Sequence, residues 1–298
     1  MADPRIYPLI DVPHEQLRSM VGAPVRSIER IEGGFTNTIH KVALESGQLL
    51  AVKHYSAGAE SFGAELATLT LLHGSLPVPD ITHVDEKAFA IVYKWIDGVT
   101  LNDLRARGPS VGFASIAEPL GRLMAWLART DATEAFELAP ILERTYQQLS
   151  SGKTRERLGV PLCDVLRKAF EASEPQLAWG TVCLAHGDLG LRNLIVQPAM
   201  KERWRISGVI DWEATTTCSP LLDIGSLFRY RHRYEQAWVD GFARGYREAD
   251  GELPDDWLRT ARLLDATWAI DTLDEPRELP GIYADCKELL ARLAADLS

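Results

Sequence analysis

The chain has no run of 18 or more apolar residues, and none of its four cysteines lies in a CxxC pair. Its most apolar helical stretch, residues 111–128, is interrupted by Glu118, Pro119 and Arg122, so no membrane span is expected. The first residues, MADPRIYPLIDVP, contain prolines and acids where a signal peptide would need a basic start and an apolar run. Because the cysteines also lack the spacing of a metal site, we expect free thiols in a cytoplasmic protein.

Basic residues are in the minority. The 298 residues include 32 Lys and Arg against 42 Asp and Glu, which gives a formal net charge of −10. Because nucleic acids and anionic membranes attract basic surfaces, this balance argues against both as main partners and mildly favours cationic ligands. The composition is otherwise that of an ordinary globular protein, with 46% hydrophobic and 25% charged residues. The length is about twice the commonest domain size, so two lobes are expected.

The first third of the chain is typical of a β-rich lobe. Apolar and polar residues alternate over residues 25–31 and 38–44, as they do in half-buried strands. Residues 48–55, 81–84 and 89–96 complete a predicted five-stranded antiparallel sheet. A helix is predicted over residues 58–73, where apolar residues recur at helical spacing, and a short one over residues 13–20.

After the Asp97-Gly98 turn the pattern becomes mainly helical. Helices are predicted over residues 100–107, 112–130, 137–150, 161–172, 219–230, 234–249, 255–273 and 281–297. One β interruption, CLAHGDLGLRNLIVQP followed by WRISGVIDWE, places polar residues inside apolar flanks. We therefore predict an α+β fold of two lobes: a small antiparallel sheet with one helix in residues 1–94, and a larger, mainly helical lobe in residues 95–298.

Three polar residues in the β interruption have a spacing suited to phosphoryl transfer. The segment HGDLGLRN places Asp188 five residues before Asn193, and Asp211 follows the strand 207–210. Moving a phosphoryl group requires a carboxylate that accepts or orients the proton of the acceptor hydroxyl, and oxygen ligands for Mg²⁺. Asp188 alone would more often cap a loop, but the register of Asn193 and Asp211 favours the catalytic interpretation.

HGDLGLRN, with IDWE downstream, resembles the phosphotransfer motifs of the aminoglycoside phosphotransferase and choline kinase family, which has a bilobal protein-kinase-like fold. The resemblance extends over roughly residues 25–230. It implies that Asp188 is the catalytic carboxylate and that Asn193 and Asp211 are the Mg²⁺ ligands. It also implies that Asp223 is a structural aspartate and that His186 braces the loop beneath Asp211, although a satisfied core histidine is the preferred interpretation.

The same segment departs from protein kinases. Gly187 stands where they have an arginine, and neither a D-F-G nor an A-P-E sequence follows Asp211. A protein kinase is therefore disfavoured.

Lys53 closes the apolar strand 49–52 and is a candidate for binding phosphate oxygens. A lysine can do so as a point charge when a carboxylate holds it in place. Glu65 and Glu60 compete for that position, and Glu65 is preferred because it neighbours the apolar stripe of its helix. The alternative is that Lys53 only extends to solvent from the end of the strand.

The resemblance also implies a nucleotide site. The loop EGGFTN between the first two strands is similar to the nucleotide-binding loop of the small-molecule kinases, and it could present backbone N–H groups to phosphates. Residues 93–98 match the hinge of the family. The implied nucleotide-binding residues are Gly34, Phe35, Thr36, Asn37, Lys53, Glu65, Lys94 (through its C=O) and Ile96 (through its N–H). Tyr93 is bulky, so GTP remains an alternative to ATP.

The acceptor could be recognised by acids of the helical lobe. Four residues recur at intervals of three and four and hence share a helix face: Asp265, Trp268, Asp271 and Glu275. An amine could bind there between acids and an aromatic ring. A solvated helix face is the alternative interpretation. Glu213 is a further candidate, with a role beside the metal ligands as its alternative.

We therefore expect a small-molecule kinase that transfers the γ-phosphate of ATP, or of GTP, to a hydroxyl of a small cationic acceptor with Mg²⁺. An aminoglycoside or another antibiotic is the favoured acceptor. The alternatives are a kinase of choline, an amino acid or a sugar, and a non-catalytic nucleotide-binding regulator. Intact Asp188, Asn193, Asp211 and Lys53 count against the regulator.

Overall fold

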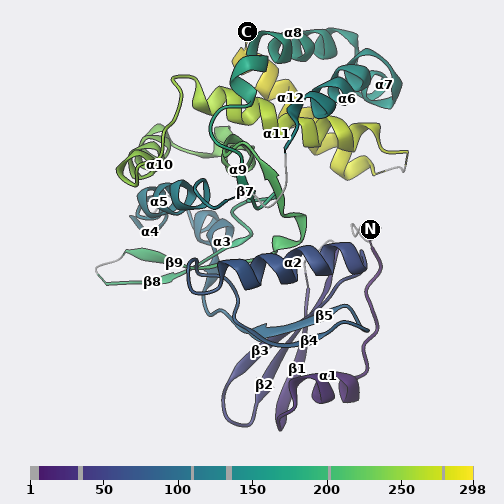
Figure 1. Cartoon of the computed structure of the whole chain (residues 1–298), viewed down its shortest axis with the longest axis vertical. Helices are drawn as coiled ribbons and strands as arrows, with labels where there is room; N and C mark the ends of the chain where they lie inside the picture. The colour runs from purple at the N-terminus through teal and green to yellow at the C-terminus, as the bar shows by residue number, and fades with distance from the viewer. Residues whose placement is uncertain are drawn as a thin grey trace. The chain divides into compact units, whose positions relative to one another are not determined.

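A computed structural model of the chain describes residues 7–32, 36–108, 111–131, 136–200, 203–276 and 279–297 (Figure 1). The chain divides into two compact units, Met1–Phe113 with Leu191–Thr215, and Ala114–Gly190 with Thr216–Ser298. By compactness, the first unit thus extends beyond residue 94 and also includes the segment 191–215. The functional division into a nucleotide-binding lobe of residues 1–94 and an acceptor-binding lobe of residues 95–298 stays a prediction.

The first unit is built on a five-stranded antiparallel sheet with the strand order β1-β2-β3-β5-β4 (Figure 1). The strands lie where the sequence pattern predicts them: β1 Val25–Ile31, β2 Thr38–Leu44, β3 Leu49–His54, β4 Ile81–Asp85 and β5 Ala90–Lys94.

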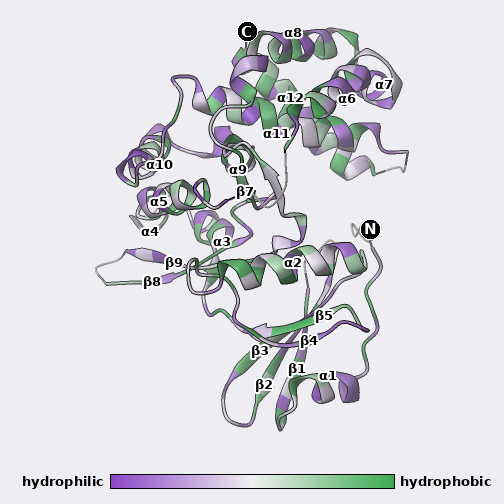
Figure 2. Cartoon of the chain, in the orientation of Figure 1, coloured by the Kyte–Doolittle hydropathy of each residue, from purple (hydrophilic) through white to green (hydrophobic). Residues whose placement is uncertain are grey.

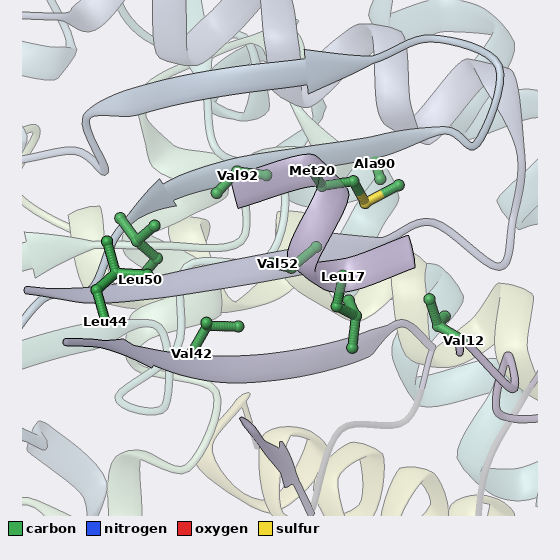
Figure 3. Packing of buried hydrophobic residues seen from close by; sticks show 9 residues of the cluster. All are labelled: Val12, Leu17, Met20, Val42, Leu44, Leu50, Val52, Ala90 and Val92. Atoms are coloured by element: carbon green, nitrogen blue, oxygen red, sulfur yellow. The ribbon is translucent and has the colours of Figure 1, made fainter. Parts of the chain in front are cut away.

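One face of this sheet packs against the short helix α1, His14–Val21. Successive residues of a strand point to opposite faces, so the residues on this face are alternate members of the central strands. Val42 and Val52 contribute to a buried cluster that α1 completes with Leu17 and Met20 (Figure 3). Gly22 caps the C-terminus of α1 with a left-handed φ of 62°.

The opposite face carries the other alternate residues and packs against helix α2, Ala59–Leu72. Ala51 and Ile91 of the sheet cluster there with Phe62 of the helix. Lys53 has the same parity as Ala51, so strand geometry directs it toward α2 and away from α1.

A second, three-stranded sheet of the first unit has the order β6-β8-β9. Its strands are β6 Val99–Thr100, β8 Leu194–Pro198 and β9 Trp204–Val209; helix α3 Leu101–Ala106 follows β6, and the 3₁₀ helix η1 Trp212–Ala214 follows β9. The Thr100 hydroxyl caps α3 by accepting a hydrogen bond from the Asp103 N–H.

The second unit is mainly helical. After α4 Val111–Ala114, which lies at the boundary between the units, its elements are α5 Ala117–Leu127, α6 Leu138–Ser150, α7 Gly152–Leu158, α8 Val160–Leu177, β7 Cys183–Ala185, β10 Thr216–Cys218, α9 Leu221–Leu227, η2 Arg231–Arg233, α10 Gln236–Glu248, α11 Trp257–Asp274 and α12 Pro280–Leu297. Strands β7 and β10 pair antiparallel. Figure 2 shows hydrophobic and hydrophilic residues interspersed along α6, α11 and α12, as partly buried helices require.

Helices α9 and α11 approach each other closely at a glycine. A Cβ added at Gly225 would lie 2.1 Å from the backbone oxygen of Ala261, so this crossing requires a residue without a side chain. The contact fixes the position of α9 and of the residues at its two ends.

Some helices differ from the sequence pattern. The helix predicted over residues 112–130 is divided into α4 and α5, and Pro119 lies in the first turn of α5, where its missing N–H is harmless. Helix α7 was not predicted, since its residues, GKTRERL, have almost no apolar periodicity. All four cysteines are free, as predicted, and they are also buried. Among the described residues, none of the helices is long and apolar enough to cross a membrane.

Candidate active site

The first unit contains a buried ion pair between Lys53 of β3 and Glu65 of α2. The Lys53 Nζ lies 2.5 Å from the Glu65 Oε2, and the two side chains are 2% and 1% exposed. Strand parity directs Lys53 to the face of the sheet that α2 covers. Glu65, rather than Glu60, is thus the carboxylate that the structure pairs with the lysine.

Two further carboxylates surround the same lysine. Its Nζ lies 2.5 Å from the Asp211 Oδ1 and 3.5 Å from the Glu213 Oε2. Burial on its own would lower the pKa of Lys53, but Asp211 and Glu65 outweigh it and hold that pKa well above its usual value. Burial raises the pKa of Glu213. We call Lys53, Glu65, Asp211 and Glu213 the lysine cluster.

Asp211 has an unusual backbone conformation for a residue other than glycine. Its φ of 71° and ψ of 56° lie in the left-handed region, immediately before η1. Such conformations carry a cost and are concentrated at functional sites. The Asp211 side chain is 41% exposed, although it contacts the buried Lys53. The turn therefore presents one carboxylate both to the lysine and to solvent.

Asn193 stands at the same end of the β8/β9 hairpin as Asp211. Leu194 pairs with Val209, and the Ile210 N–H donates a 3.0 Å hydrogen bond to the Asn193 C=O. The hairpin thus brings the two predicted metal ligands to neighbouring positions in its ladder.

The donors at this end of the hairpin suit a divalent cation. Carboxylate oxygens of Glu65, Asp211 and Glu213 all lie within 4.8 Å of one another. Mg²⁺ prefers oxygen ligands and is commonly held by one or two carboxylates. The chemistry of the residues present therefore fits the predicted metal.

Part of the predicted nucleotide loop lies outside the described residues, namely Gly33, Gly34 and Phe35. Thr36 and Asn37 are described, and Asn37 links the loop to the lysine cluster. Its side-chain amide donates to the Glu213 carboxylate, and its side-chain oxygen accepts a 3.3 Å hydrogen bond from the Ser56 N–H. The sequence pattern did not predict this link.

The predicted hinge follows β5. The Lys94 Nζ lies 3.1 Å from the Asp80 Oδ2, and the Lys94 N–H donates to the Asp80 C=O. The side chain of Ile96 lies close to Gly208 of β9. Nucleotide binding through the Lys94 C=O and the Ile96 N–H stays a prediction.

In the second unit, Asp188 lies on a loop whose backbone is hydrogen-bonded to Asp223. The buried Asp223 carboxylate accepts hydrogen bonds from the backbone N–H groups of His186, at 2.7 Å, and Gly187, at 3.0 Å. Burial raises the pKa of Asp223. The His186 Nδ1 accepts a 3.4 Å hydrogen bond from the Asp188 N–H. Asp223 and His186 thus both support the loop, as the sequence predicts for residues with structural roles.

The backbone conformation of Gly187 explains why this chain has a glycine where protein kinases have an arginine. Its φ of 83° lies in the left-handed region, which L side chains rarely adopt. An arginine at this position would strain the loop that presents Asp188. The side chain of Asp188 is 57% exposed, so its carboxylate is accessible.

The acids predicted to bind the acceptor are occupied by cations of this chain. Asp265 is buried and accepts hydrogen bonds from two nitrogens of Arg229, at 2.9 and 2.8 Å. Asp271 accepts from Arg144, at 2.6 Å, and from the Gln148 amide, at 2.7 Å. In this structure both acids are thus bound by groups of the same chain. Acceptor binding by Asp265 and Asp271 stays a prediction.

Trp268 and Glu213 also lie in surroundings that the sequence pattern did not predict. The Arg229 guanidinium carbon lies 4.3 Å from the centre of the Trp268 ring, which is 42% exposed. Arg229 therefore contacts both Asp265 and Trp268. Acceptor binding by Trp268 stays a prediction. Glu213 belongs to the lysine cluster, in line with its alternative role beside the metal ligands.

A model of the phosphotransferase enzyme family matches residues 27–263. The chain belongs to this family. The predicted family and the predicted enzyme class, a phosphotransferase with an alcohol group as acceptor, are thereby confirmed. A search of the curated proteins found no match.

Solved structures confirm the protein-kinase-like fold of this phosphotransferase. Choline kinase LicA from Streptococcus pneumoniae is 19% identical, with a TM-score of 0.66 over 95% of this chain and 97% of that chain. Macrolide 2'-phosphotransferase MphH from Brachybacterium faecium is 18% identical, with a TM-score of 0.67 over 95% and 97%. A thermostable mutant of aminoglycoside phosphotransferase APH(4)-Ia is 15% identical, with a TM-score of 0.68 over 96% and 98%.

Proposed function

We propose that this phosphotransferase transfers the γ-phosphate of Mg·ATP to a hydroxyl of a small-molecule acceptor, with Asp188 as the catalytic carboxylate. The observation that carries the proposal is that one motif contains both the supported loop of Asp188 and a predicted metal ligand. HGDLGLRN presents Asp188 on a clamped loop and continues to Asn193, which lies beside Asp211 at the hairpin end. A protein that only bound nucleotide would have no need for the accessible carboxylate.

The lysine cluster is the proposed triphosphate site. Lys53 would donate to phosphate oxygens, and Glu65 would hold the ammonium group in position. Asn193 and Asp211 would hold Mg²⁺, which neutralises charge on the transferring phosphoryl group when it is bound. Thr36, Asn37, Lys94 and Ile96, with Gly34 and Phe35 of the loop, complete the proposed nucleotide site.

Asp188 would act on the acceptor. Its carboxylate accepts the proton of the attacking hydroxyl as the new P–O bond forms and the bond between the γ-phosphorus and the ADP oxygen breaks. The carboxylate is exposed enough to receive an acceptor, and Asp223 keeps the loop in place during the reaction.

For the acceptor we propose a hydroxylated antibiotic first and a metabolite such as choline, an amino acid or a sugar second. The similarity to choline, macrolide and aminoglycoside phosphotransferases supports both classes. The internal pairing of Asp265 removes one reason to require a cationic acceptor. Four buried thiols are in keeping with a reducing cytoplasm, the proposed location.

The decisive experiment is a coupled assay of ADP release from Mg·ATP and from Mg·GTP. The panel contains aminoglycosides, peptide and macrolide antibiotics, choline, homoserine and sugars. We expect one acceptor class to raise ADP release well above the rate with water, and phosphorylated product to appear in mass spectra. Nucleotide binding without product on any acceptor would support the regulator instead.

A further inference from the structure

We infer that Arg229 is a positioning residue for the catalytic carboxylate: its guanidinium, fixed by Asp265 and Trp268, holds the side chain of Asp188 in the orientation that meets the acceptor hydroxyl. This inference rests on the proposed role of Asp188. It assigns Asp265 and Trp268 to the support of Arg229 and not to the acceptor.

The first observation is the contact itself. The Arg229 Nη1 lies 3.5 Å from the Asp188 Oδ1, which is long for a hydrogen bond but within the range of an ion pair. Such contacts are often loose before the substrates bind. The guanidinium is 14% exposed and the carboxylate 57%, so the cation is the fixed partner and the carboxylate the accessible one.

The second observation is how firmly Arg229 is held. Its Nε donates to one Asp265 oxygen and its Nη2 to the other, the parallel geometry that a planar fork makes with a carboxylate. The same Nη2 also donates to the Ser226 hydroxyl, at 3.2 Å. The Trp268 ring covers the guanidinium face, at 4.3 Å. Nη1 is the nitrogen that this arrangement directs toward Asp188.

The third observation is that the residues contacting the backbone and the side chain of Asp188 both lie on or next to one short helix, α9. Asp223, in the first turn of α9, accepts hydrogen bonds from the backbone immediately before Asp188, and Arg229 lies two residues beyond the end of α9. The close crossing at Gly225 fixes α9 against α11, the helix that carries Asp265 and Trp268. The backbone and the side chain of Asp188 thus depend on the same packing.

The arrangement has a chemical consequence. A carboxylate that accepts a proton must be ionised and must have one oxygen directed at the hydroxyl. A guanidinium near Oδ1 favours the ionised form and limits the orientations of the carboxylate. Misplacing such a group by 1 Å can cost about 100-fold in rate. Loss of Arg229 should therefore lower kcat and leave nucleotide affinity intact.

The test compares Arg229→Met, Arg229→Gln and Arg229→Lys with the wild type. ADP release is measured from Mg·ATP with the best acceptor of the panel or, failing one, with water. We expect kcat to fall at least about tenfold in Arg229→Met and Arg229→Gln, with the KM for Mg·ATP within about twofold of the wild type. Arg229→Lys should recover part of kcat, because it restores the charge but not the fork.

Arg157→Met is the matched control. Arg157 also stacks on an aromatic ring, 4.1 Å from the centre of Tyr283, and donates to backbone oxygens at the end of α11. It should lose thermal stability without loss of kcat. An unchanged kcat in Arg229→Met, or an equal loss in Arg157→Met, would overturn the inference.

If Arg229→Met does not fold, the comparison of the lysine and glutamine variants decides. Equal kcat values for those two would then contradict the inference. A wild type without any ADP release, by contrast, would contradict the proposed function itself.

Discussion

The two units each hold a buried cation among carboxylates, but the two cations are held in different ways. Lys53 is a point charge with three carboxylate neighbours, at 2.5, 2.5 and 3.5 Å. Arg229 is a planar fork that shares two parallel hydrogen bonds with Asp265 and lies over an aromatic ring.

This difference fits a different role for each cation: Lys53 in a site for phosphate and metal, and Arg229 in the support of a catalytic side chain. Three carboxylates around one ammonium group leave the lysine cluster with an excess of negative charge, which a divalent cation would neutralise. Around Arg229 two carboxylates exceed the guanidinium by one negative charge only, and the hydrogen bonds to Asp265 and Ser226 fix the orientation of the fork, which suits a support. We therefore expect variants of Lys53 to affect both the affinity for the nucleotide and the rate, and variants of Arg229 to affect the rate but not the affinity for the nucleotide.

Lys53→Met should have the largest effect. We expect kcat/KM for Mg·ATP to fall at least about 100-fold, because the phosphate contact and its charge are lost. The free energy of unfolding should fall by about 3–5 kcal/mol, because Glu65 is left buried without its partner. Kinetics and urea unfolding measure the two effects.

The double variant Lys53→Met, Glu65→Leu separates these effects. It should regain much of the stability, since paired apolar side chains can replace a buried ion pair, but none of the activity. Recovery of activity in the double variant would contradict the role of Lys53.

Gly225→Ala should have the next largest effect. The added Cβ would lie 2.1 Å from the Ala261 oxygen, so α9 must move away from α11. We expect a loss of about 3 kcal/mol in stability and about tenfold in kcat, the latter because Arg229 moves with the helix. Thermal unfolding and steady-state kinetics measure these changes.

Gly63→Ala in α2 is the control for this substitution. Nothing lies within 4 Å of a Cβ at Gly63, so the variant should gain about 0.5–1 kcal/mol. A harmless Gly225→Ala would show that the close crossing does not hold the catalytic loop.

A pair of histidines should affect stability but not catalysis. His40 and His54 are buried on the α1 face of the sheet, with ring centroids 6.4 Å apart. Burial and the neighbouring His40 lower the pKa of His54 to about 4. The unfolded chain, with a histidine pKa of about 6.5, then binds more protons than the folded one.

The stability that depends on neutral His54 is therefore fully present above about pH 6.5 and is lost as the pH falls toward 4. We expect a loss of about 3 kcal/mol over that window. His54→Leu should abolish most of this pH dependence and leave kcat at neutral pH unchanged, whereas exposed His83→Leu should not. Denaturant unfolding at several pH values measures this pH dependence. If the free energy of unfolding of His54→Leu depended on pH as strongly as that of the wild type, His54 would not be its source.

The sequence predicts the fold closely wherever a period is clear. Alternation located β1 and β2, and helical spacing located α2 and α10. Helix α7 was not predicted because its seven residues are mostly polar and show no periodic spacing of apolar side chains. Its contacts with α6 and α11 hold it in place.

The candidate site was predictable where residues are near in sequence or belong to a motif. Lys53 and Glu65 are twelve residues apart on adjoining elements, so strand and helix parity suffices to pair them. Arg229 and Asp265 are 36 residues apart, and their contact depends on the close crossing at Gly225. The spacing of Asp265 and Trp268 fits either a bound amine or an arginine of the same chain, and sequence spacing does not distinguish the two.

The most direct test of the central claim is single-turnover phosphoryl transfer by Asp188→Asn, with Mg·ATP affinity measured by calorimetry on the same sample. The amide keeps the shape of the side chain and removes the proton acceptor. We predict a nucleotide affinity within about twofold of the wild type and a transfer rate at least about 100-fold lower. A variant that keeps a tenth of the wild-type rate would contradict the assignment of Asp188 as the catalytic carboxylate.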